Sequence, residues 1–200
     1  MLKNTLNSIS PLDGRYATKL IELEQYFSEF ALIKNRVIVE INWLIFMSRT
    51  KSLSFVPALS KNKETSLLKI IEEFSLKDAE QIKKIEAKTN HDVKAVEIFI
   101  RKKLESLNLK KYSEFVHLFC TSEDINNLSY SLMLKSYLDN EFKKEVDNKW
   151  RKHLCWINKN SKPNNYHSSA IKGVLTYMNS ADKSHLLPTS IEKLEFIDKV

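Results

Sequence analysis

The chain has 200 residues, enough for one domain or slightly more, and 42% of them are hydrophobic. It contains only two glycines and four prolines, and a chain so poor in turn-forming residues favours long helices over many short strands. The net charge is +7, but acidic and basic residues are interleaved over most of the chain, which is typical of solvated helix faces rather than of a nucleic-acid-binding stripe. We therefore predict an all-α protein that does not bind nucleic acid as its main function.

The cysteines and the apolar runs exclude further classes. Cys120 and Cys155 have neither the spacing of metal ligands nor the disulfide framework of a secreted domain, so we predict no metal site. The first residues, MLKNTLNSISPLDG, lack the apolar core of a signal peptide, and the run WLIFM is far shorter than the ~20 residues that span a bilayer. We expect a soluble, cytoplasmic protein that does not bind a membrane.

The first predicted helix follows an irregular N-terminal segment. Residues 1–17 contain the string SPLDGRY, whose Ser-Pro and Asp-Gly pairs are typical of turns. Apolar residues at spacings of three and four then predict a helix from about Thr18 to Met47, with a break expected near Ser28. The stretch around Pro57 is predicted to be a loop.

Two shorter helices are predicted next. The first is marked by four apolar residues at helical spacing, Leu67, Ile70, Ile71 and Phe74. Ser75 and Asp78 then resemble a capping box, with Asp in place of the usual Glu, so a second helix should start there. Its apolar residues are Ala79, Ile82 and Ile85.

Two further helices are predicted to begin at polar segments. One apolar face, made of Val93, Val96, Ile100 and Leu104, predicts a helix that begins near Asp92. Thr121 or Ser122 is predicted to cap the last long helix. The buried face of that helix should start with Ile125, Leu128 and Leu132. After about Phe142 the chain is polar and rich in Lys and Asn, and only SIEKLEFIDKV near its end is typical of a helix.

Two of these helix N-termini carry polar segments that suit an anion, TNHD at 89–92 and TSED at 121–124. The first turn of a helix offers unpaired N–H groups and a partial positive charge, to which phosphates bind readily. Arg15 could hold phosphate or carboxylate oxygens in a bidentate pair, and Tyr16 could stack on a base. If these groups converge, they form a site for a small molecule that carries a phosphate and carboxylates.

Each of these residues also has a structural interpretation. Plain N-capping would explain Asn90 and Thr121, and His91 could be a neutral capping or surface histidine. His117, inside FVHLF, fits a core histidine with a satisfied hydrogen bond, and Arg15 could be an ordinary surface arginine. Spacing alone therefore indicates a helical domain with candidate anion sites.

Three strings carry a resemblance to a known family: SPLDGRY, KTNHDVKAVE and EFVHLFCTSEDINNLSYSLMLK. They are similar to the bacterial-type adenylosuccinate lyase family, within the fumarase/aspartase superfamily, almost continuously from residue 8 to about 142. The resemblance implies an N-terminal helical domain over residues 1–117 and the start of a central helix bundle over residues 118–149. Residues 150–200 would then be a divergent tail of undefined fold.

The resemblance also implies an activity and an assembly. Members of the family eliminate fumarate from adenylosuccinate, which gives AMP, and from the succinyl-carboxamide nucleotide of purine biosynthesis. They need no metal or organic cofactor, and they assemble as homotetramers whose sites combine several subunits. We therefore expect a nucleotide substrate, no cofactor and a homotetramer.

The resemblance assigns substrate binding to seven residues: Arg15, Tyr16, Asn90, His91, Asp92, Thr121 and Ser122. It also places His117 near the substrate phosphate. The motifs of the family's general acid and base are not found in this chain. The nearest match to the acid is His167 in NYHSSAIKG, but this string lacks the Gly-Gln-Pro of the family and lies too close to Thr121.

Two main interpretations of the function follow, and a third, a small basic nucleic-acid binder, is suggested only by the positive charge of residues 150–200. The first is a truncated, inactive relative of adenylosuccinate lyase that retains part of the substrate site. The alternative is a non-catalytic helical protein that binds lyase subunits or a nucleotide.

Overall fold

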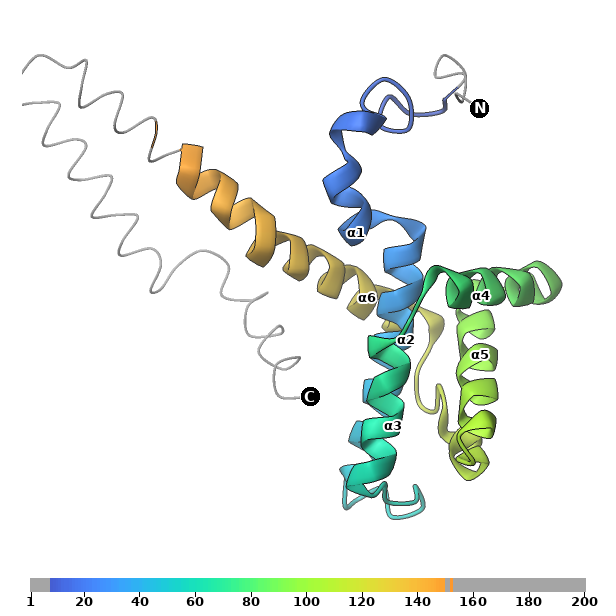
Figure 1. The fold of residues 1–200 in the computed structure, drawn as a ribbon. Helices are drawn as coiled ribbons and strands as arrows, with labels where there is room; N and C mark the ends of the chain where they lie inside the picture. The colour runs from blue at the N-terminus through green and yellow to red at the C-terminus, as the bar shows by residue number, and fades with distance from the viewer. Residues whose placement is uncertain (1–7, 150–151, 153–200) are drawn as a thin grey trace, which may run out of the picture. The chain divides into compact units, whose positions relative to one another are not determined.

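The part of the chain that the structure describes consists of helices joined by loops. A computed structural model describes residues 8–149 and 152, and every regular element in these residues is a helix (Figure 1). The predicted all-α class is confirmed. No helix among these residues is both long enough and apolar enough to cross a bilayer. His167 and the predicted helix in SIEKLEFIDKV lie outside the described residues.

The N-terminal segment consists of short helical turns before the first long helix. Two 3-10 helices, η2 (Ala17–Lys19) and η3 (Ile21–Leu23), lead into the single turn of α1 (Glu24–Phe27). Ser28 then adopts an extended conformation, and its side chain accepts a hydrogen bond from the backbone N–H of Ala31 at 3.2 Å. The predicted break near Ser28 is confirmed, because this serine caps the next helix.

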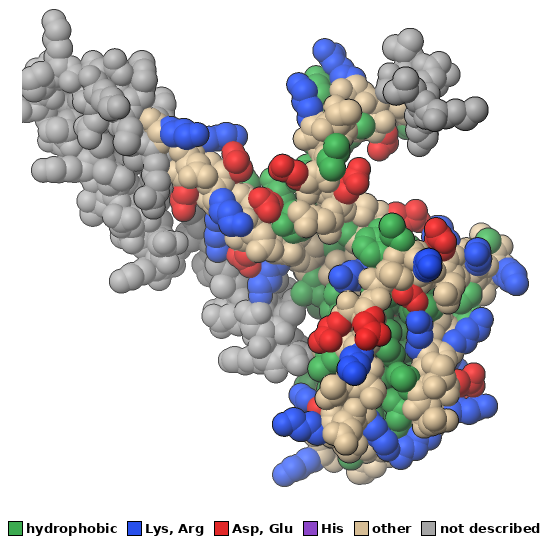
Figure 2. Space-filling model, in the orientation of Figure 1, with side chains coloured by type: hydrophobic (Ala, Val, Ile, Leu, Met, Phe, Trp, Pro, Cys, Tyr) green, Lys and Arg blue, Asp and Glu red, His purple; other side chains and the backbone are tan. Residues whose placement is uncertain are grey.

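Helix α2 (Glu29–Arg49) is the centre of the fold. It contacts α3 (Lys61–Glu72), α4 (Leu76–Thr89), α5 (Asp92–Ser106) and α6 (Ser122–Tyr137). The main core lies between these helices, and its fully buried side chains include Val37, Ile41, Leu44, Met47, Leu67, Ile100, Leu104 and Tyr112. Figure 2 shows charged side chains of both signs on the outer surfaces of these helices and hydrophobic side chains between them.

Helices α3 and α4 lie where the sequence predicts them, except that α3 ends earlier than expected. Helix α3 ends at Glu72, so Phe74 lies in the connection, where it is buried and packs edge-on against Phe99 at 6.0 Å between ring centroids. The capping box before α4 is confirmed, since the Ser75 backbone N–H donates to the Asp78 carboxylate at 3.1 Å.

Helices α5 and α6 supply the two N-termini that the sequence marked. Helix α5 begins at Asp92, as predicted, and a 3-10 helix, η4 (Lys110–Phe115), follows it. In α6 the predicted buried position of Leu128 is wrong, because its side chain is 41% exposed. The buried face runs instead through Ile125, Ser129 and Met133, and the Ser129 hydroxyl is hidden by donating to the Ile125 carbonyl at 2.7 Å.

The chain divides into two units, and the first, which ends at Tyr137, contains all the residues of the candidate functional site. The second unit begins with a π-helical turn, η5 (Leu138–Phe142), that continues as α-helix to residue 149. Within it, Lys143 Nζ lies 3.0 Å from Asp139 Oδ1.

Candidate functional site

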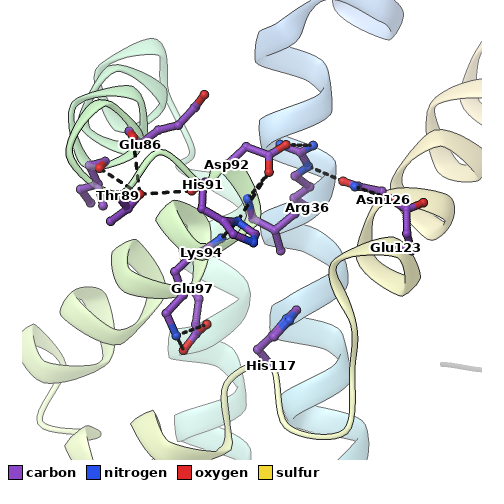
Figure 3. A network of polar contacts seen from close by, with 12 residues as sticks. Arg36, Glu86, Thr89, His91, Asp92, Lys94, Glu97, His117, Glu123 and Asn126 are labelled. Atoms are coloured by element: carbon purple, nitrogen blue, oxygen red, sulfur yellow. Dashed lines mark hydrogen bonds and ion pairs between the residues drawn. The ribbon is translucent and has the colours of Figure 1, made fainter.

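The side chain of Arg36 joins the N-termini of α5 and α6. It comes from the middle of α2 and is 5% exposed. One terminal nitrogen donates to Asp92 Oδ2 at 2.6 Å, and Nε donates to Asn126 Oδ1 at 2.9 Å (Figure 3). Asp92 is the first residue of α5 and Asn126 lies in the first turns of α6, so one guanidinium fixes the two helix starts together. We call this meeting point of α2, α5 and α6 the junction.

At the start of α5, His91 is the N-cap. Its Nδ1 accepts a hydrogen bond from the backbone N–H of Lys94 at 3.2 Å, so a neutral ring carries its proton on Nε2. The side chain is half exposed. The capping interpretation of His91 is therefore confirmed, and the cap still leaves Nε2 as a donor toward a ligand.

Asp92 is held as a carboxylate beside this cap. Partial burial acts to raise its pKa, but the hydrogen bond from the Val93 backbone N–H at 2.8 Å and the charge of Arg36 outweigh that effect. The pKa of Asp92 is therefore below its ordinary value, and the ion pair with Arg36 is present at neutral pH.

The N-capping interpretation of Asn90 is wrong. Asn90 is the C-cap of α4 in the left-handed conformation, with φ 51° and ψ 34°, and its N–H donates to the Glu86 carbonyl at 2.7 Å. Helix α4 must end and reverse into α5 within two residues, and asparagine tolerates the left-handed region better than most residues. The N-cap position consequently falls to His91.

This backbone role of Asn90 gives a separable prediction. Asn90→Gly should leave the free energy of unfolding nearly unchanged, whereas Asn90→Ala should lower it by about 1 kcal/mol, because only glycine adopts a positive φ without a steric cost. Urea unfolding of both variants measures the difference. Equal losses in the two variants would contradict a purely conformational role and would point to the side-chain amide.

The start of α6 is closed by three hydrogen bonds between Thr121 and Asp124. The Thr121 backbone N–H and hydroxyl both donate to Asp124 Oδ2 at 2.7 Å, and the Asp124 N–H donates to Thr121 Oγ1 at 3.3 Å. The predicted cap is therefore Thr121, and Ser122 is the first helical residue. The bonds from Thr121 lower the pKa of Asp124. By helix geometry, other N–H groups of this first turn have no intrahelical acceptor and can bind an anion.

The loop before α6 is fixed to α2 by two further side chains. His117 Nδ1 lies 2.6 Å from Oε1 of the fully buried Glu40, and Trp43 Nε1 donates to the Leu118 carbonyl at 2.8 Å. Both His117 and Phe119 have left-handed backbones, with φ 65° and 63°. The interpretation of His117 as a histidine with a satisfied hydrogen bond is confirmed, and its partner places it beside the junction (Figure 3).

Burial controls the ionisation of the groups behind this loop. It raises the pKa of the Glu40 carboxyl, although the bond to His117 acts in the opposite direction. The second oxygen of Glu40, Oε2, is buried without a hydrogen-bond partner. Burial, with the charges of Glu40 and Asp124, also raises the pKa of the Cys120 thiol to about 11, so this thiol is protonated and a poor nucleophile at neutral pH.

The predicted site residues are therefore only partly brought together. His91, Asp92, Thr121 and Ser122 belong to helix starts that meet at Arg36. Arg15 and Tyr16 contact each other, with the guanidinium carbon 5.3 Å from the ring centroid. Figure 1 shows that their N-terminal segment lies apart from the start of α5.

Sequence reasoning missed Arg36, Glu40 and Trp43. All three belong to the first long helix, and the two charged residues stand in or beside its most apolar part, RVIVEINWLIF. A charged side chain inside such a run is seldom buried unless it is paired. The position of Arg36 and Glu40 in the sequence could therefore have indicated that each has a partner. Among the described residues, no group of three or more His, Cys, Asp or Glu side chains could hold a metal ion.

Comparison with known proteins gives one consistent family. A lyase family model matches residues 14–152. Adenylosuccinate lyase of Haemophilus influenzae is 47% identical over 152 residues, which cover 74% of this chain and 33% of the relative. The Escherichia coli K12 enzyme of the same name is 47% identical over 137 residues, or 68% of this chain and 30% of the relative. That of Buchnera aphidicola from Schizaphis graminum is 46% identical over 137 residues, with the same shares.

The chain thus spans about a third of the length of the curated relatives that it matches. The match includes both helix starts and all the α2 residues that join them. The chain belongs to this lyase family, and its first seven-tenths are homologous to the N-terminal part of bacterial adenylosuccinate lyases.

Proposed function

We propose that this chain binds the substrate or product of an adenylosuccinate lyase reaction, the elimination of fumarate from adenylosuccinate to give AMP. The succinyl-carboxamide nucleotide of purine biosynthesis would be the second substrate. The observation that carries the proposal is the junction, where Arg36 holds the starts of α5 and α6 together. Relatives named for this reaction match these same segments, and they supply the chemical identity of the ligand.

Each helix start has groups that suit part of such a ligand. His91 offers Nε2–H, and the first turn of α6 offers backbone N–H groups next to Thr121 and Ser122. These donors match the oxygens of a phosphate or a carboxylate. His117 would reach the phosphate from the neighbouring loop, held there by Glu40.

The N-terminal segment that carries Arg15 and Tyr16 lies apart from the start of α5 (Figure 1), so these two residues would have to reach the same ligand from another copy of the chain. This requirement agrees with the homotetramer that the family resemblance implies. We therefore include a homotetramer in the proposal, with substrate-binding groups contributed by more than one subunit.

We further propose that the chain by itself binds without turnover. The elimination needs a base to remove a proton beside a carboxylate and an acid to protonate the departing nitrogen. The described residues near the junction serve as caps, ion pairs and donors, and the Cys120 thiol stays protonated at neutral pH. The alternative, a non-catalytic protein that binds lyase subunits, predicts capture of those subunits without affinity for AMP.

Calorimetric titration of the chain with AMP tests the proposal. AMP should bind, and His91→Ala should weaken its affinity about tenfold, since the variant loses a hydrogen bond to a charged group. Ser75→Ala is the matched control, because it removes a helix cap from α4 without touching the junction, and it should leave the affinity unchanged. No fumarate should be released from adenylosuccinate.

Two results would contradict the proposal in different ways. An AMP affinity that falls equally in His91→Ala and Ser75→Ala would mean that the loss of any helix cap weakens binding. The imidazole of His91 would then have no specific role in binding AMP. Fumarate release that His91→Ala abolishes would show a working active site and would refute binding without turnover.

A further inference from the structure

Two grooves flank helix α4, and they differ in charge. The first, about 470 Å³ in volume, lies between α2 and α4 and is lined by two acidic residues, Glu29 and Glu80, and two basic ones, Lys83 and Lys84. The second, about 580 Å³, lies between α4 and α5. It is lined by Lys84, Lys88, Lys102 and Lys103, with Ile85 and Phe99 among its apolar residues, and no carboxylate lines it. We call the second the basic groove.

Lys83, which lines only the first groove, forms ion pairs with two glutamates. Lys83 Nζ lies 2.7 Å from Glu29 Oε1 and 2.8 Å from Glu86 Oε2, so its charge is balanced within the protein. On α5, Lys94 is balanced in the same way by Glu97 at 2.9 Å. The surface of these two helices thus neutralises a lysine where a partner stands three residues away.

The basic groove lacks this balance. Lys103 is paired with Asp78 at 2.8 Å and lies 5.1 Å from the Phe99 ring centroid. For Lys84, Lys88 and Lys102, none of the described carboxylates forms an ion pair. All three are exposed. Three uncompensated ammonium groups around one concave surface repel each other, and an anion bound between them would relieve that repulsion.

The arrangement of the lysines favours an extended anion over a single small one. Lys84 and Lys88 are one helical turn apart on α4, about 6 Å along its axis, and Lys102 lines the same groove from α5. Lysine binds phosphate as a mobile point charge and needs no fixed geometry, which suits several phosphate groups in a row.

We propose that the basic groove binds a chain of two or three linked phosphate groups, either as an inorganic oligophosphate or as the phosphate tail of a nucleotide. The basic groove shares no side chain with the junction, so this proposal does not depend on the proposed lyase-type binding. The nearby apolar surface of Ile85 and Phe99 could contact a nucleoside carried on such a chain.

Calorimetric titration of the full chain with inorganic tripolyphosphate at low ionic strength tests this site. Removing one exposed charge should weaken binding about fivefold, so Lys84→Ala, Lys88→Ala and Lys102→Ala together should weaken it by roughly two orders of magnitude. Lys83→Ala is the matched control on the same helix and should change the affinity less than twofold, because that lysine is already paired. Circular dichroism of the triple variant should equal that of the parent, since exposed lysines do not support the core.

Four comparisons complete the test. ATP that displaces tripolyphosphate and binds more tightly would support the site and identify a nucleotide as its source, whereas weaker ATP binding would support the inorganic chain. Equal losses in Lys83→Ala and in the single groove variants would overturn the proposal, since binding would then follow diffuse charge. Binding of an RNA oligonucleotide that tripolyphosphate cannot displace would also overturn it. The triple lysine variant should bind AMP as tightly as the parent does, which separates this site from the junction.

Discussion

Replacing His117 with alanine should lower the free energy of unfolding by about 3 kcal/mol at pH 8, because the change leaves the buried Glu40 carboxylate without its partner. The other oxygen of Glu40 already lacks a hydrogen bond, so no second contact can compensate. Urea unfolding of the parent and the variant at pH 8 measures the loss.

The loss should depend on pH in a defined direction. Burial raises the pKa of Glu40, and His117 acts to lower it, so the raising effect is stronger in the variant. A carboxyl whose pKa is raised by folding favours the folded state below its unfolded pKa, and that contribution is lost as the pH rises through the folded pKa. The deficit of His117→Ala should therefore become smaller as the pH falls, because Glu40 then takes up a proton more readily.

A second variant separates this mechanism from general damage to the loop. Adding Glu40→Leu to His117→Ala should recover most of the stability at pH 8, because an apolar side chain of similar size removes the buried charge. A double variant that is no more stable than His117→Ala would show that the loop, and not the unpaired carboxylate, causes the loss.

Arg36→Met should lower the free energy of unfolding by about 2 kcal/mol at pH 7, because it removes a buried guanidinium that bonds two helix starts. Asp92 is 45% exposed on its side chain and can be rehydrated, which keeps the loss below that of a fully buried pair. The pKa of Asp92 is lowered in the folded protein, so this pair stabilises above the unfolded pKa and is lost as the pH falls through the folded pKa. The difference between Arg36→Met and the parent should therefore diminish below about pH 4.

The chain offers a matched control for Arg36. Arg49 forms a pair with Glu64 at 2.6 Å, the same distance as that between Arg36 and Asp92, but the Arg49 side chain is 59% exposed. Arg49→Met should cost less than about 1 kcal/mol, as for other surface ion pairs. Arg36→Met should also weaken AMP binding, whereas Arg49→Met should not. Equal losses of unfolding free energy in the two variants would mean that the buried ion pair of Arg36 stabilises the fold no more than the exposed pair of Arg49.

Local capping chemistry made much of the fold predictable. The break at Ser28, the capping box at Ser75 and the start of α5 at Asp92 each depend on side chains within three residues of the helix end. The assignment failed at Asn90, where the end of one helix and the start of the next compete for adjacent residues. It failed at Leu128 because a serine that bonds its own helix can replace an apolar residue on the buried face.

The contacts that build the junction could not be predicted in this way. Arg36 bonds residues 56 and 90 positions away, and Glu40 bonds a residue 77 positions away. Helical periodicity describes which face of α2 is apolar, but it contains no information about which partner meets a charge on that face. The family resemblance identified the helix starts, and only the packing of α5 and α6 on α2 reveals what holds them.

Three residues of α2 hold the starts of α5 and α6 and the loop before α6: Arg36, Glu40 and Trp43. They are spaced by four and three residues, so they lie on one face of the helix. An inserted residue between the first and second would rotate everything after it by about 100°. Arg36 would still contact Asp92 at the start of α5. Glu40 and Trp43 would no longer point toward the loop before α6. We therefore expect this stretch of α2 to accept substitutions of its outward residues but no insertion, and an insertion scan through it should be far less permissive than one through the Pro57 loop.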